Sequence, residues 1–91
     1  MKRNELIKKL NKKFPTINAQ ISEDVGFTDG GIWVDAESST DKEGLPLFDY
    51  WSEDYEEILY VMKVRKPLHD LLDQAGYFAE FQNAGTVLIW E

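Results

Sequence analysis

The chain has 91 residues, no cysteine and a formal net charge of −7, which is the size of one small domain and leaves no room for two. The lack of cysteine excludes disulfides, thiol nucleophiles and thiolate metal sites, and it fits a reducing compartment. A hydrophobic content of 43% with 13% aromatic residues argues against disorder. No apolar run approaches the roughly 18 residues of a membrane span, so we expect a cytoplasmic protein without a signal peptide or a membrane partner.

Charge is distributed unevenly along the chain. Residues 1–13 hold six basic side chains against one acid, a net charge of +5, whereas residues 14–91 sum to −12. Most of the negative charge falls in residues 23–57, where Lys42 faces twelve acids. Such an asymmetry acts on solubility, partner choice and association rate rather than on the fold.

Residues 4–14 are predicted to form an amphipathic helix. Asn4 is a suitable N-cap, and Pro15 ends the helix because it disfavours the helical conformation at the residue before it. The residues that recur at the spacing of one helical face are Leu6, Ile7, Leu10 and Phe14.

Strict alternation predicts two strands, residues 17–21 and 31–37, paired antiparallel across a loop. The side chains of the second strand should divide between the two faces of the sheet. We expect Ile32, Val34 and Ala36 on the core face, and Trp33, Asp35 and Glu37 on the other.

The middle of the chain is harder to interpret. Residues 38–46 have the composition of a polar loop, and residues 47–51 are compatible with a short strand. Residues 52–64 match both a helix and a strand, because short apolar runs cannot be separated by periodicity. We favour a strand over 57–62.

Residues 66–75 are predicted to form a second helix, with Pro67 in its first turn and Gly76 just beyond its end. Its buried stripe is Leu68, Leu71, Leu72 and Ala75. Residues 77–81 and 86–90 then form a hairpin.

Together these elements predict an α+β domain spanning residues 1–91. The expected architecture is a mainly antiparallel sheet of four or five strands with two helices on one face. The expected order is α-β-β-(β)-(β or α)-α-β-β, and a helix-strand-strand pattern occurs twice, at 4–37 and 66–90.

No catalytic signature is present in the sequence. It has no glycine-rich phosphate loop after a strand, no nucleophile elbow and no histidine pair. His69, the single histidine, could serve as a metal ligand or general base beside Asp70 and Asp73. The leucine stripe places it on the outer face of its helix, so we interpret it as a surface residue. We expect no catalytic, cofactor-binding or metal-binding residue, and no enzymatic activity.

An acidic, aromatic-rich stretch over residues 33–57 is the candidate functional region. It has three interpretations: a solvated surface, a divalent-cation site, or a docking face for a basic partner. No EF-hand spacing supports the cation site. Trp and Tyr are favoured as anchors within polar rims. The candidate partner-binding residues are Trp33, Asp35, Glu37, Asp49, Tyr50, Trp51, Glu53, Asp54, Tyr55, Glu56 and Glu57.

A pattern of glycines and aromatics carries a resemblance to a known group of proteins. The segments are Gly30-Gly31-Ile32-Trp33-Val34, Leu47-Phe48-Asp49-Tyr50, Gly76-Tyr77-Phe78-Ala79-Glu80-Phe81 and Asn83-Ala84-Gly85-Thr86-Val87. In outline, residues 30–90 resemble short acidic proteins encoded by bacteriophages and other mobile elements. The resemblance implies a bacterial host cell as the setting and transfers no catalytic residue.

The leading hypothesis is therefore a phage-type inhibitor whose face over 33–57 occupies a basic surface of a host protein, for example a nucleic-acid-binding one. Two alternatives stay open. One is a nucleic-acid-binding module that uses the basic first helix, although the acidic body disfavours nucleic acid as the partner; its lysines are Lys8, Lys9, Lys12 and Lys13. The other is a homodimer formed through a strand edge or the aromatic patch.

Overall fold

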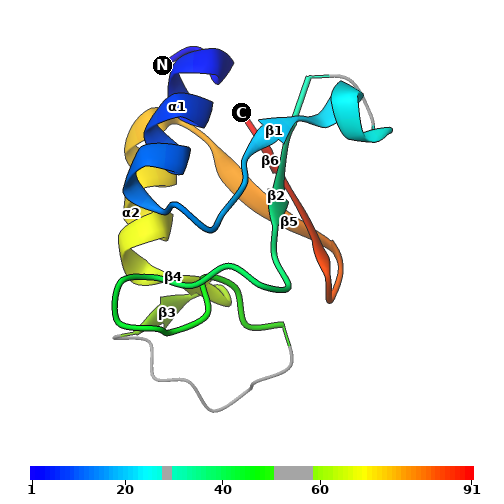
Figure 1. Ribbon diagram of the computed structural model, residues 1–91. Coiled ribbons are helices and arrows are strands. Elements are labelled where there is room, and N and C mark those ends of the chain that lie inside the picture. The colour runs from blue at the N-terminus through cyan, green and yellow to red at the C-terminus, as the bar shows by residue number, and fades with distance from the viewer. Residues whose placement is uncertain (28–29, 51–58) are drawn as a thin grey trace.

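The computed structural model describes residues 1–27, 30–50 and 59–91, and it shows an α+β fold (Figure 1). The helices are α1 (Arg3–Lys13), α2 (Lys66–Ala75) and the short 3-10 helix η1 (Ser22–Val25). A four-stranded antiparallel sheet contains β1 (Gln20–Ile21), β2 (Ile32–Asp35), β5 (Phe78–Asn83) and β6 (Thr86–Trp90). A separate hairpin contains β3 (Tyr60–Val61) and β4 (Val64–Arg65). The predicted fold class and strand number are confirmed.

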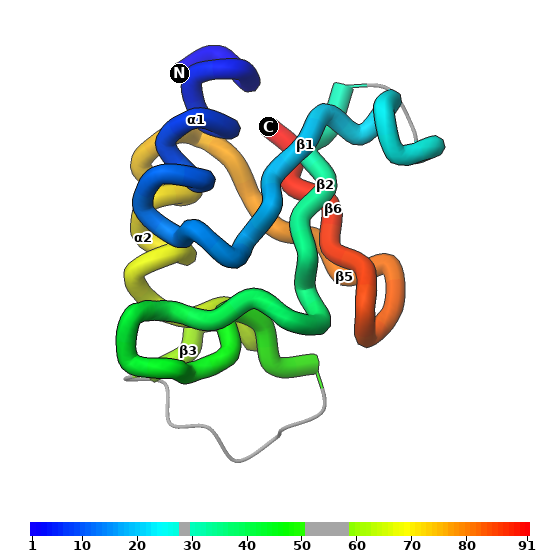
Figure 2. Tube along the Cα trace, viewed as in Figure 1, coloured from blue at the N-terminus to red at the C-terminus, as the bar shows by residue number. Residues whose placement is uncertain are grey.

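The sheet has the order β1-β2-β6-β5. The two helix-strand-strand segments of the sequence meet at its centre, where β2 pairs antiparallel with β6 and Val34 lies opposite Val87. Each segment contributes its second strand to this central pair and its first strand to an edge, as the trace in Figure 2 shows. The predicted antiparallel pairing of the first two strands is confirmed by the β1–β2 register.

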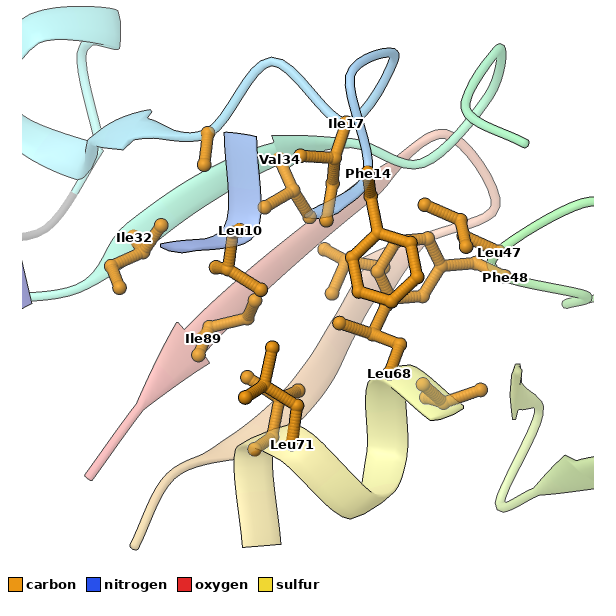
Figure 3. Packing of buried hydrophobic residues seen from close by; sticks show 14 of the residues in the cluster. Leu10, Phe14, Ile17, Ile32, Val34, Leu47, Phe48, Leu68, Leu71 and Ile89 are labelled. Carbon is orange, nitrogen blue, oxygen red and sulfur yellow. The ribbon is translucent and has the colours of Figure 1, made fainter. Parts of the chain in front are cut away.

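The hydrophobic core lies between the sheet and the two long helices, which cover the same face (Figure 3). Leu10 of α1 and Leu68 of α2 are fully buried against Ile32 and Ile89 of the sheet. Burying a leucine or isoleucine side chain contributes about 1.5–3 kcal/mol, so these contacts are what hold both helices on one side. Within the described ranges, neither helix has the length and apolarity needed to cross a membrane.

The first helix and the strand after it differ from the sequence prediction. The helix begins at Arg3 with Lys2 as its N-cap and no side-chain cap hydrogen bond, so the assignment of Asn4 as N-cap is wrong. Of the predicted strand 17–21, only the last two residues form β1, although the Ile17 carbonyl accepts a hydrogen bond from the Asp35 amide of β2 at 2.8 Å. Its earlier part is held differently, because the Asn11 amide bonds both backbone groups of Ala19, at 3.1 and 2.7 Å.

Residues 47–51, predicted as a strand, make only an isolated bridge in their described part. Phe48 bridges Val64, and the Asp49 amide donates to the Lys63 carbonyl. Of the predicted strand 57–62, residues 60–61 form β3. The question of helix or strand for residues 52–58 lies outside the described residues. The β3–β4 turn has positive φ at Met62 and Lys63, 51° and 68°, which is the geometry of a tight hairpin turn built without glycine.

Candidate interaction surface

The sheet face opposite the helices carries a group of large apolar side chains that we call the open sheet face. It consists of Trp33, Phe78, Leu88 and Trp90, which the strand register brings together because Trp33 lies opposite Leu88 and Phe78 opposite Trp90. Since side chains alternate along a strand, Trp33 points away from the core that Ile32 and Val34 enter.

These side chains support one another. Leu88 is only 2% exposed although it lies outside the helix-side core, and its neighbours in the register are Trp33 and Glu80. The Trp90 ring packs over Gly31, where an added Cβ would lie 2.9 Å from a ring carbon. Phe78 stays 51% exposed. The surface is thus pre-ordered, which lowers the entropy lost on binding.

Three carboxylates near this surface form what we call the acidic rim: Asp35, Glu37 and Glu80. Asp35 accepts hydrogen bonds from the backbone amides of Glu37 and Ser38, at 3.0 and 2.9 Å, and so closes the turn after β2. This turn brings the Glu37 carboxylate beside Gly85, in the β5–β6 turn. Glu80 is exposed on the same sheet face as Phe78.

The predicted partner-binding residues do not gather on a single surface. Trp33 and Asp35 belong to the open sheet face and its rim, whereas Tyr50 lies on the helix side, its ring 5.5 Å from that of Phe81. Asp49 is half-buried next to Tyr50. The remaining predicted residues, Trp51, Glu53, Asp54, Tyr55, Glu56 and Glu57, lie outside the described residues.

A groove, which we call the edge groove, lies between α2 and β5 and has a volume of about 360 Å³. Its lining is mainly apolar and comes from three elements. The hairpin contributes Met62 and Val64, α2 contributes His69, Leu72 and Asp73, and β5 contributes Phe78, Ala79 and Phe81. Met62 is 84% exposed, which is high for a large apolar side chain at a groove.

His69, predicted to be a surface residue, is half-buried at this groove. Its Nδ1 lies 3.6 Å from an Asp70 oxygen and has no hydrogen-bond partner. Across residues 1–27, 30–50 and 59–91, no three His, Asp or Glu side chains come together in a way that could hold a metal ion.

One of the acidic residues, Asp41, stabilises the fold through a largely buried ion pair. Arg65 donates to Asp41 over 2.7 Å, and both side chains are only 10% exposed. The other Asp41 oxygen accepts from the backbone amides of Glu43 and Leu45. Burial raises the pKa of Asp41, but these hydrogen bonds outweigh burial, so its pKa lies below the usual value. Asp41 therefore stays ionised and anchors its loop to β4.

Glu23 of η1 joins the first helix to the turn before β2. It accepts from Arg3 at 2.8 Å, from the Ser22 hydroxyl and from the Gly30 amide. The Arg3 hydrogen bond is the largest cause that lowers the Glu23 pKa to about 2. Arg3 also donates to the Gly31 carbonyl, directly before β2.

The basic residues lie on the helix side of the molecule. Lys8, Lys9, Lys12 and Lys13 are all exposed on α1, and no ion pair connects them to a described carboxylate. Because α1 and the open sheet face lie on opposite sides of the sheet (Figure 1), the cationic and aromatic surfaces are separate.

Comparisons of the chain with protein-family models, with curated proteins and with solved structures found no match.

Proposed function

We propose that the protein is a non-catalytic interaction module whose open sheet face binds a basic surface of a partner protein. The observation that carries this proposal is an aromatic sheet face that neither long helix covers, with Phe78 half exposed. Exposed apolar patches rimmed by polar residues mark interaction sites, and aromatic side chains dominate their binding energy.

Electrostatics supports a basic partner. The acidic rim borders the aromatic side chains, and the whole chain carries a net charge of −7. Long-range attraction to a basic surface accelerates encounter and weakens as salt screens it. The aromatic anchors then supply contact energy that salt does not screen, so binding should be weakened by salt rather than abolished.

In its biological setting, a bacterial host cell, the protein acts as an inhibitor. The resemblance to acidic phage and mobile-element proteins supports this setting, and carboxylates can bind the cationic side chains that normally contact phosphates. We propose that the target is a nucleic-acid-binding protein whose basic site is blocked.

The test is capture from bacterial lysate at low and high salt, followed by affinity measurement with the identified, purified partner. The open-face variant carries Trp33→Ala and Glu37→Gln, and the matched control carries Lys8→Gln and Lys12→Gln on α1. We expect the open-face variant to weaken the affinity by about tenfold or more, while the control changes it little. Equal affinity of wild type and open-face variant would refute the proposal. A further variant, with Glu53, Asp54, Glu56 and Glu57 changed to Gln, tests the predicted acids that lie outside the described residues.

One observation favours nucleic-acid binding as the second candidate, namely the four exposed α1 lysines without described ion-pair partners. A gel-shift assay with a short duplex at low salt separates the two functions. Our proposal predicts no shift, because the acidic body repels phosphates, and a shift that disappears with Lys8→Gln and Lys12→Gln would replace it.

A further inference from the structure

Strand β5 forms an open edge of the sheet. It pairs with β6 on one side, and no described residue pairs with its other side. At six residues it offers far more backbone than β1, the opposite edge, which has two. Natural edge strands are commonly protected by lysine, proline or a bulge. Between Phe78 and Phe81 there is no lysine or proline, and the register irregularity comes only after Phe81.

The edge groove lies between this strand and α2. Its volume of about 360 Å³ is within the range of about 300–1,000 Å³ typical of ligand sites. Leu72 and Phe81 are apolar residues of its lining, and the exposed side chains of Met62 and Phe78 also line it. Unpaired backbone donors and acceptors therefore adjoin a hollow that accepts apolar side chains.

We propose that the partner contributes an extended segment that adds as a fifth strand along β5. This inference rests on the proposed function and specifies the form in which the partner binds. In strand addition, main-chain hydrogen bonds supply affinity and alternate side chains supply specificity.

The two faces of the added strand would contact different kinds of side chain. Side chains on the helix side enter the apolar edge groove, whereas those on the other side lie beside Glu80, across the continued sheet face. Opposite charges on neighbouring strands stabilise pairing. The segment that fits alternates apolar residues with lysine or arginine.

A second copy of the chain is a poorer occupant. Each copy carries a charge of −7, and antiparallel pairing of two β5 strands brings the Glu80 residues close to each other. Charge complementarity thus favours a basic peptide over self-pairing.

The experiment uses the full chain and a fluorescein-labelled ten-residue peptide of alternating valine and lysine, with binding followed by fluorescence anisotropy. Two derivatives carry backbone N-methyl groups, one at every valine and the other at every lysine. In an added strand, alternate residues direct their amides toward β5. One derivative should therefore lose affinity by about tenfold or more, and the other should bind within about twofold of the parent peptide. Equal behaviour of the two derivatives overturns strand addition.

Protein variants locate the site. We expect Met62→Ser to weaken binding of the valine–lysine peptide, and Glu80→Lys to transfer the preference to a valine–glutamate peptide. The control variant carries Lys8→Gln and Lys12→Gln on α1, exposed residues that belong neither to the edge groove nor to the open sheet face, and it should leave peptide affinity unchanged.

Two further outcomes would contradict strand addition at β5. Absence of peptide binding up to about 1 mM overturns the inference, as does a concentration-dependent dimer that excludes the peptide. Either result is compatible with the proposed function if the open-face variant fails to bind the captured partner. Conversely, the peptide could bind at β5 while the open-face variant still binds the captured partner normally. That result would support strand addition and refute the proposed function.

Discussion

The contact between Gly31 and Trp90 sets a limit on what position 31 tolerates. A Cβ there would meet the Trp90 ring at 2.9 Å, so Gly31→Ala must displace a ring that completes the open sheet face. We expect a loss of about 1–3 kcal/mol in the free energy of unfolding, measured by urea denaturation. Gly85→Ala is the matched control, because its nearest contact is 3.5 Å, and it should change stability by less than about 0.5 kcal/mol. Equal stability of the two variants would mean that the ring is not held at Gly31.

The Arg65–Asp41 pair is the most enclosed charge contact among the described residues. Arg65→Met leaves a largely buried carboxylate without its cation, and we expect this to cost about 3 kcal/mol of stability in urea unfolding. The double variant Arg65→Met with Asp41→Asn should recover part of the loss, because it removes the unpaired charge. A double variant as unstable as the single one would show that Arg65 stabilises the fold through its other contacts, such as its hydrogen bond to the Leu59 carbonyl, rather than through the pair.

At the level of elements, the Arg3–Glu23 contact that joins α1 to η1 makes the fold sensitive to acid. Because the folded-state pKa of Glu23 is lowered to about 2, its contribution is present above the unfolded-state value, 4.5, and is lost as the pH falls toward 2. Asp41, whose pKa is also lowered, acts in the same direction. The melting temperature should fall between pH 5 and pH 2, and fall less for Glu23→Gln. Identical pH profiles would contradict the role given to Glu23.

Elements with local sequence signals could be predicted, and those fixed by distant contacts could not. Helix α2 has the predicted bounds because Pro67 suits its start and Gly76, at φ 79°, ends it. The strand at 17–21 is interrupted at Asn18, where φ is 50°, and the Asn11 side chain bonds the backbone of Ala19. Periodicity reveals neither feature. The turn at Met62 and Lys63 lacks the Asn or Gly that marks such turns.

The candidate surface was only partly predictable for the same reason. Alternation alone separates Trp33 from Ile32 and Val34, and the burial pattern of β2 confirms that division. Trp90 and Phe78 join Trp33 only because β6 lies between β2 and β5, an order that the sequence does not specify. Tyr50 was grouped with Trp33 because the two are near in sequence, yet they lie on opposite faces of the sheet.

On the scale of the whole molecule, the basic helix face and the aromatic sheet face lie on opposite sides, so a partner can bind one without touching the other. This separation gives the most direct test of the central claim, a hydrogen–deuterium exchange footprint of the captured partner on the protein. If the partner binds the open sheet face, amide exchange becomes slower in β2, β5 and β6 and stays unchanged in the exposed turns of α1. Protection confined to α1, with the sheet unaffected, would contradict that claim.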